Sequence, residues 1–172
     1  MSDGFTADDF DRAVAVVSAE TSPRSLAERL GVDWDYLSWL ALDAAATVLG
    51  AEREGRGVVV SYGGEAFTAG FLVGAHVSGP ARLCVEATQG RLSEAAHAVQ
   101  QRGRHAVIAD HCDLAGVARL ESVYADALVE SMAVAPEERP ALVAPVTRLF
   151  EAGLAVGLEL RSGRGGGAAE EL

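Results

Sequence analysis

The sequence predicts an α/β fold, in which a parallel sheet is flanked by helices and preceded by an N-terminal helical segment. Short apolar runs alternate along the chain with stretches of helical periodicity, and this alternation is typical of parallel strands joined by right-handed crossovers. A length of 172 residues with 49% hydrophobic residues suits one globular domain that buries its own core. We expect a helical segment over 1–32, the α/β domain over 33–161 and a flexible, glycine-rich tail over 162–172.

Three helices are predicted before residue 52. Thr6 is suited to cap the first helix, and two aspartates follow in its first turn, where the helix dipole favours negative charge. A second, short helix is predicted over 25–30 and ends at Gly31. Asp33 is a good cap for the third helix, which is expected to run to about residue 51.

After these helices the predicted strands and helices alternate. The first four strands are expected to be parallel neighbours, which brings the loops at 61–65 and 110–116 to one end of the sheet. The predicted strands are 58–60, 82–86, 106–109, 128–134 and 156–160, and the predicted helices are 66–77, 114–124 and 144–152.

The charge balance bears on the partners of the protein. The formal net charge is -11, which repels phosphate backbones and acidic lipids, so neither a nucleic acid nor a membrane surface is an expected partner. No apolar run reaches the roughly 18 residues of a membrane span, and the N-terminus lacks the layout of a signal peptide. Cys84 and Cys112 have no paired spacing and are expected to be thiols of a cytoplasmic protein.

The chain contains neither lysine nor asparagine. This composition excludes a Schiff-base lysine, a lysine general base and a Walker phosphate loop. His111 stands beside Cys112, but adjacent residues on one loop rarely share a target, so we expect neither a metal site nor a nucleophile–base pair there. No metal ligands are assigned.

A helix-turn-helix spacing is present over 25–33, which leaves DNA binding as an alternative for the N-terminal region. The recognition helix would begin with Asp33, Trp34 and Asp35 and has no arginine before Arg53. Side chains that contact base edges are normally Arg, Lys, Asn or Gln. We therefore expect this segment to pack or to form a dimer interface, and we expect a homodimer.

Two segments follow predicted strands and are candidates for a ligand site. Glycines in the segments 61–65 and 110–116 would let backbone N–H groups approach an anion closely. The alternative for the second segment is an ordinary strand-to-helix turn with capping aspartates. The alternative for Gly63 and Gly64 is a tight turn.

The second segment also carries a resemblance to a known family. The run 106–118 resembles the phosphoribosyl pyrophosphate (PRPP) loop of type I phosphoribosyltransferases, in which acidic residues, apolar residues and a glycine follow an apolar strand. The block 58–75 is similar to the pyrophosphate-binding turn of that family, and 148–156 is similar to the end of orotate phosphoribosyltransferases. The resemblance covers roughly 33–161 and rests on the order and spacing of elements.

The resemblance implies a glycosyltransferase of nucleotide metabolism with Asp110 and His111 as catalytic residues. Asp110 would stabilise the ribosyl cation, and His111 would take the place of the second carboxylate. Mg²⁺ would be required only if PRPP is bound, carried mostly by its pyrophosphate. The expected ligand is a phosphorylated ribose or nucleotide, held by Tyr62, Gly63, Gly64, Glu65, Arg91, Asp113, Ala115, Gly116 and Ala118.

Several positions depart from the pattern of the family. Leu114 and Ala115 stand where the family has two threonines, and Asp113 adds a negative charge where a phosphate would arrive. Each missing charge-assisted contact weakens binding by roughly 1.5–3 kcal/mol. The site is therefore degenerate. Two functions stay open, namely a PRPP-dependent transferase that acts on a nucleobase-like heterocycle and a catalytically inactive descendant that senses a ligand or binds a partner.

Overall fold

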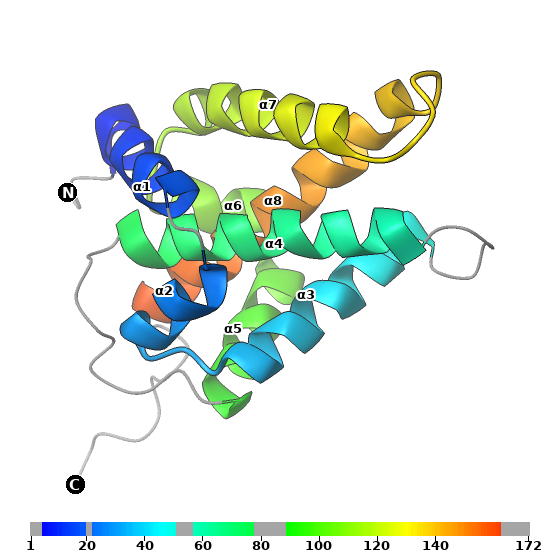
Figure 1. The fold of residues 1–172 in the computed structure, drawn as a ribbon. Coiled ribbons are helices and arrows are strands. Elements are labelled where there is room, and N and C mark those ends of the chain that lie inside the picture. The colour runs from blue at the N-terminus through cyan, green and yellow to red at the C-terminus, as the bar shows by residue number, and fades with distance from the viewer. Residues whose placement is uncertain (1–4, 20–21, 51–56, 78–88, 163–172) are drawn as a thin grey trace, which may run out of the picture.

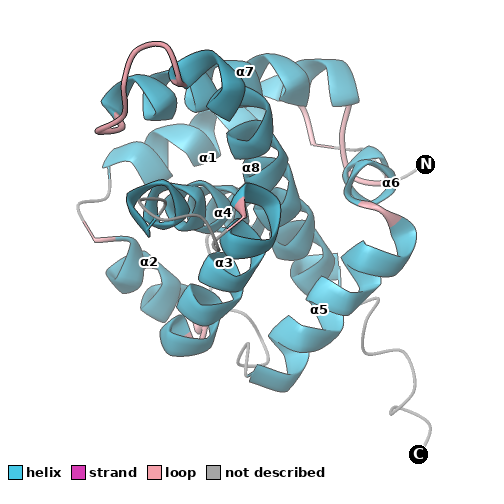
Figure 2. Cartoon of the chain, turned by 90° about the vertical axis from the view of Figure 1, so that its right-hand side faces the viewer, coloured by secondary structure: helices cyan, strands magenta, loops and turns pink. Residues whose placement is uncertain are grey.

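The computed structural model describes residues 5–19, 22–50, 57–77 and 89–162, and within them every regular element is a helix (Figure 2). Two long helices cross in the middle, and the other six surround them (Figure 1). The one strand-like pairing in these ranges is an isolated bridge between Phe5 and Cys112. The helices are α1 (Ala7–Ala19), α2 (Pro23–Leu30), α3 (Trp34–Leu49), α4 (Gly57–Val77), α5 (Gln89–Arg102), α6 (Arg104–Ala109), α7 (Leu114–Ser131) and α8 (Arg139–Ser162).

The predicted α/β fold is wrong. The runs 58–60 and 156–160 lie inside α4 and α8, 106–109 belongs to α6, and most of 128–134 is the last turn of α7 and the segment after it. The remaining predicted strand, 82–86, lies outside the described residues. Short apolar runs do not distinguish a buried strand from a buried helix, and the burial of α4 and α8 on most sides made these runs helical.

The resemblance to type I phosphoribosyltransferases fails with the sheet. The PRPP loop of that family connects a parallel strand to a helix, whereas here 110–113 joins two helices. The pyrophosphate-binding turn expected at Gly63 and Gly64 is continuous helix within α4. The order of apolar runs, turns and glycines is similar to that of the family, but in the described residues those runs form helices rather than strands.

Glycines bring α4 and α8 together at the centre of the fold. A Cβ on Gly74 would lie 2.5 Å from the carbonyl oxygen of Leu154, and a Cβ on Gly153 would overlap the carbonyl oxygen of Phe67. Both neighbours are backbone atoms, which cannot rotate away as a side chain can. The glycines therefore allow the two backbones to touch, and α4 and α8 make the most extensive helix contact in the described chain.

The N-terminal helices confirm the predicted caps. The Thr6 hydroxyl accepts a hydrogen bond from the backbone N–H of Asp9 (3.3 Å), and Asp9 in turn accepts one from the N–H of Thr6 (2.8 Å). Gly31 ends α2 in the left-handed conformation with φ 81°. Asp33 caps α3 by accepting a hydrogen bond from the N–H of Tyr36 (3.1 Å).

Two helices in the described chain, α4 and α8, are long and apolar enough to cross a membrane by length and composition alone. In the fold, 67% of the apolar window of α4 and 61% of that of α8 are buried. The core helices of soluble proteins show the same properties, so this observation is weak evidence for a membrane span. The two helices nevertheless differ from the expectation that no segment is long and apolar enough for a membrane span. The cytoplasmic location stays a prediction.

Candidate functional site

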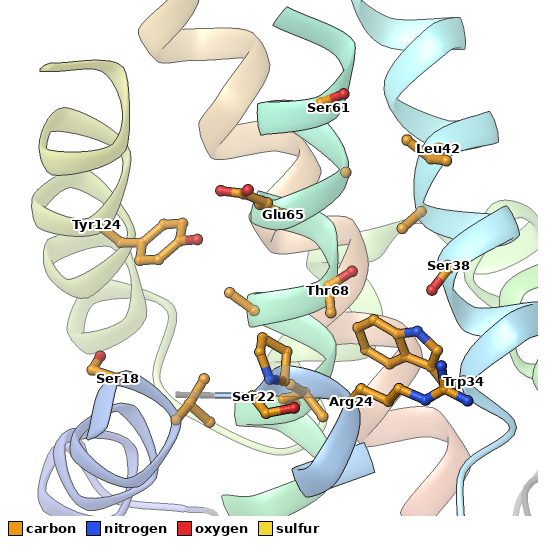
Figure 3. A pocket seen from close by; sticks show the side chains of 16 residues that line it. Ser18, Ser22, Arg24, Trp34, Ser38, Leu42, Ser61, Glu65, Thr68 and Tyr124 are labelled. Atoms are coloured by element: carbon orange, nitrogen blue, oxygen red, sulfur yellow. The ribbon is translucent and has the colours of Figure 1, made fainter. Parts of the chain in front are cut away.

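A groove of about 770 Å³ opens on the side of α4 that faces α3 and α7 (Figure 3). Its floor is one face of α4, where the lining positions recur at helical spacing. Trp34 and Ser38 of α3 stand on one side and Tyr124 of α7 on the other, while the end of α1 and the start of α2 close one end. The α4 residues that line the groove are Ser61, Gly64, Glu65, Thr68, Ala69 and Leu72.

Glu65 is the one carboxylate among the described residues that line the groove. It lies on the exposed side of α4, and its side chain makes no hydrogen bond or ion pair with the described part of the chain. The Thr68 side chain, one helical turn further on, is 8% exposed and lines the same groove. The floor therefore offers a full negative charge and a hydroxyl within one turn of helix.

Tyr124 forms the wall opposite Trp34 (Figure 3). Its ring packs against Phe150 of the core, with 4.6 Å between the ring centroids. Burial raises the pKa of the Tyr124 hydroxyl, and the negative charge of Glu65 raises it further. The hydroxyl consequently remains protonated, and it presents a neutral donor and acceptor beside the carboxylate.

Arg24 is the one basic side chain among the described residues that line the groove. Its Nε donates to Glu28 at 2.9 Å, one helical turn along α2. The charge of Arg24 is thus matched within its own helix, while the charge of Glu65 is not matched among the described residues. The local balance of the groove is negative.

A second cluster of ionisable groups lies between α6, α7 and α8, and its two glutamates are largely buried. The Glu121 carboxyl of α7 is hydrogen-bonded to Glu151 of α8, which accepts from Arg104 Nε at 2.5 Å and lies 3.0 Å from His105 Nε2. Burial and the Glu151 charge raise the pKa of Glu121 to about 9, so Glu121 is the proton donor of the pair at neutral pH. The hydrogen bonds from Glu121, Arg104 and His105 lower the pKa of Glu151 despite its burial. This cluster attaches α7 to the core.

The site residues predicted in the segment 61–65 lie on different faces of α4. Glu65 and Gly64 line the groove. Gly63 faces the core, where a Cβ would lie 2.6 Å from the side chain of Leu49. The Tyr62 hydroxyl donates to the carbonyl of Ser131 (3.3 Å) and so ties α4 to the end of α7.

The predicted catalytic pair lies elsewhere, at a pocket of about 550 Å³ between the α6–α7 connection and the start of α1. Asp110 is ion-paired with Arg102, which also donates to the buried Glu159 (3.2 Å). The ring of His111 stacks on Phe5 with 6.4 Å between the centroids, and the His111 carbonyl accepts from the N–H of Phe5 (2.7 Å). These contacts hold the N-terminal segment and α6 in place. The pocket and the groove share no described lining residue.

The other predicted residues of the second segment belong to the start of α7. Asp113 caps this helix by accepting from the N–H of Ala115 (3.1 Å). This agrees with the capping that the alternative of a strand-to-helix turn predicted, but the turn joins two helices, α6 and α7. Gly116 lines the pocket beside Asp110, Ala118 is exposed on α7, and Arg91 is half-buried near the start of α5. The roles given to these residues followed from a sheet that the described chain does not contain.

Cys112 is a buried thiol in the connection between α6 and α7. It donates to the carbonyl of Ile108 at 3.1 Å, and burial, aided by nearby Glu121 and Asp113, raises its pKa to about 12. A thiol in this state is not a nucleophile at neutral pH. No group of three or more His, Cys, Asp or Glu side chains suited to a metal occurs in the described ranges. Cys84 lies outside them.

The sequence reasoning missed Trp34, Ser38, Thr68 and Tyr124 as site residues. Helical spacing of polar residues along 61–68 would have indicated a common face, but only for one continuous helix, whereas 61–65 was predicted to be a loop and the helix to begin at residue 66. Comparisons with protein-family models, with curated proteins and with solved structures found no match to this chain. The function is therefore inferred from the residues of the groove.

Proposed function

We propose that the protein binds a small organic cation in the groove between α3, α4 and α7. The observation that carries the proposal is Glu65, a carboxylate without an ionic partner among the described residues, on the floor of a largely apolar groove. Concave sites with apolar walls and a few polar groups are typical of small-molecule binding. This role develops the expected alternative of a ligand-sensing protein without the phosphoribosyl chemistry.

The residues around Glu65 suit a cation better than an anion. The face of an aromatic ring attracts a cation, and Tyr124 and Trp34 stand on opposite walls. Hydroxyl groups such as that of Thr68 accept hydrogen bonds from an ammonium group. The net charge of -11 also attracts cations to the protein and repels anions.

Titration calorimetry with ligands of one size and different charge tests the proposal. We expect benzylamine and benzyltrimethylammonium to bind, and benzyl alcohol and benzoate to bind at least tenfold more weakly. The Glu65→Gln variant should lose about tenfold in affinity for the two cations, because it removes a charge-assisted contact that is partly screened by water.

Glu94→Gln is the matched control, since Glu94 is an exposed glutamate on α5 that lies away from the groove. This variant removes the same charge from the whole protein, so it should bind the cations as the unmodified protein does. If benzoate binds as tightly as benzylamine, or if E65Q and E94Q bind the cations equally well, the proposal is wrong.

A further inference from the structure

A second groove, of about 560 Å³, runs between α1 and α7. Apolar side chains form most of its described lining, with Phe10 and Val14 from α1 and Leu120 and Val123 from α7. Along α7 the lining extends from Gly116 to Ala127, which at about 1.5 Å per residue is a length of about 16 Å. The groove is thus long and mostly apolar, which suits an extended apolar group.

The second groove adjoins the first. Ser18, near the end of α1, and Tyr124, in the middle of α7, line both of them. Figure 3 shows these two side chains on the same side of the first groove, with Glu65 facing that side from α4. A ligand whose charged end lies at Glu65 therefore has a continuous path past Tyr124 into the space between α1 and α7.

Apolar side chains are exposed to water along this path. Val123 is 67% exposed, although a position between Leu120 and Ala127 on the groove side of α7 is normally covered in a packed helix pair. Covering such surface with an alkyl group is favourable in proportion to the area removed from water. The exposed valine and the apolar lining together indicate an occupant that is hydrocarbon rather than polar.

We infer that the ligand is an amphipathic cation with an alkyl tail, whose head lies at Glu65 and whose tail passes Tyr124 to lie between α1 and α7. The inference rests on the proposed function for the position of the head. Tyr124 and Ser18 form the junction through which the tail passes, and the α1–α7 groove determines the length of tail that is accepted. Long-chain amines and quaternary alkylammonium ions have this chemistry.

The test is calorimetry with butyl-, hexyl-, octyl- and decyltrimethylammonium, each below its micelle concentration. Affinity is expected to rise about fourfold with each added methylene, which is the increment for burying a methylene group. Val123→Arg places a charge in the α1–α7 groove and should flatten the dependence of affinity on tail length. Ser122→Arg adds the same charge at the neighbouring exposed position, which does not line the groove, and should keep the full dependence.

The outcomes distinguish the tail from the head. If the cations bind through Glu65 but affinity does not depend on tail length, the tail inference is overturned and the proposed function stands. An equally steep dependence in V123R and S122R also overturns it, because the tail then lies elsewhere. If tail length matters but Glu65→Gln has no effect, the tail groove is supported and the proposed function is overturned. If none of the cations binds, both fail. Circular dichroism of each variant verifies that it is folded.

Discussion

Helix α4 has two faces that differ in how closely they are packed. On one face, Gly70 and Gly74 lie directly against the backbone of α8, with no room for a methyl group. On the other face, Gly64 and Glu65 border a groove of about 770 Å³. Small residues are present on both faces, so residue size alone does not produce close packing.

The neighbour of each glycine explains the difference. The atoms nearest to Gly74 belong to the backbone of Leu154 and Leu158, which is held in place by the hydrogen bonds of α8. The atoms nearest to Gly64 belong to the side chain of Leu42, which is 46% exposed and can rotate. A glycine that meets a backbone brings two helices together, whereas a glycine beside a mobile side chain leaves space.

The largest expected effect is on the close-packed face. Gly153→Ala would overlap the carbonyl oxygen of Phe67, so α8 must move away from α4 or the helices must distort. We expect a loss of about 3–5 kcal/mol in the free energy of unfolding, at the upper end of the effects of overpacking and of single substitutions. Urea denaturation measures it. A loss below about 1 kcal/mol would show that the backbones are not in contact.

The second prediction concerns the carboxyl pair that attaches α7 to α8. The pKa of Glu121 is raised to about 9 in the folded protein, above the ordinary value of 4.5, so the folded state binds the proton more tightly than the unfolded state. Stability should therefore fall as the pH rises from about 4.5 towards 9. Glu121→Gln keeps a donor to Glu151 and cannot ionise, so it should remove this slope.

At pH 8 the E121Q variant should be about 1–3 kcal/mol more stable than the unmodified protein, and near pH 5 the two should be alike. Thermal melts across this pH range measure the difference, and G153A should show the same pH slope as the unmodified protein because its defect involves no charge. An E121Q variant that keeps the full slope would place the titration in another group.

A smaller effect is expected from salt. With a net charge of -11, the carboxylates repel one another, and sodium chloride shortens the Debye length from about 30 Å at 0.01 M to about 3 Å at 1 M. We expect a gain on the order of 1 kcal/mol, or about 2–4 °C in the melting temperature. The deficit of G153A relative to the unmodified protein should be the same at both salt concentrations. A deficit that shrinks with salt would indicate that the contact between α4 and α8 is electrostatic.

The smallest effect is expected at Gly64, on the groove face. A Cβ there would lie 3.2 Å from Cδ2 of Leu42, whose exposed side chain can move aside. Alanine favours a helix over glycine by about 0.5–1 kcal/mol, so Gly64→Ala should change the unfolding free energy by less than about 1 kcal/mol in either direction. Urea denaturation of G64A and G153A side by side compares the groove face of α4, which meets Leu42 of α3, with the face that packs against α8. Equal losses in the two variants would mean that the two faces of α4 are packed alike.

The sequence by itself determined the caps and the charge of this protein. Thr6, Gly31 and Asp33 mark the ends of α1, α2 and α3 because a cap depends on residues within one turn of it. The acidic balance follows directly from composition. These features need no information about distant parts of the chain.

Only the tertiary structure decided between strand and helix for the apolar runs, and only it assembled the groove. The run 58–60 suits either form, and it is helical because α4 as a whole is buried against α8 and its neighbours. Glu65 and Tyr124 lie far apart in the sequence and meet because α7 packs beside α4 and α8. Likewise, the sequence does not show whether a glycine such as Gly70 meets a backbone or an open space, because that depends on which helix lies opposite.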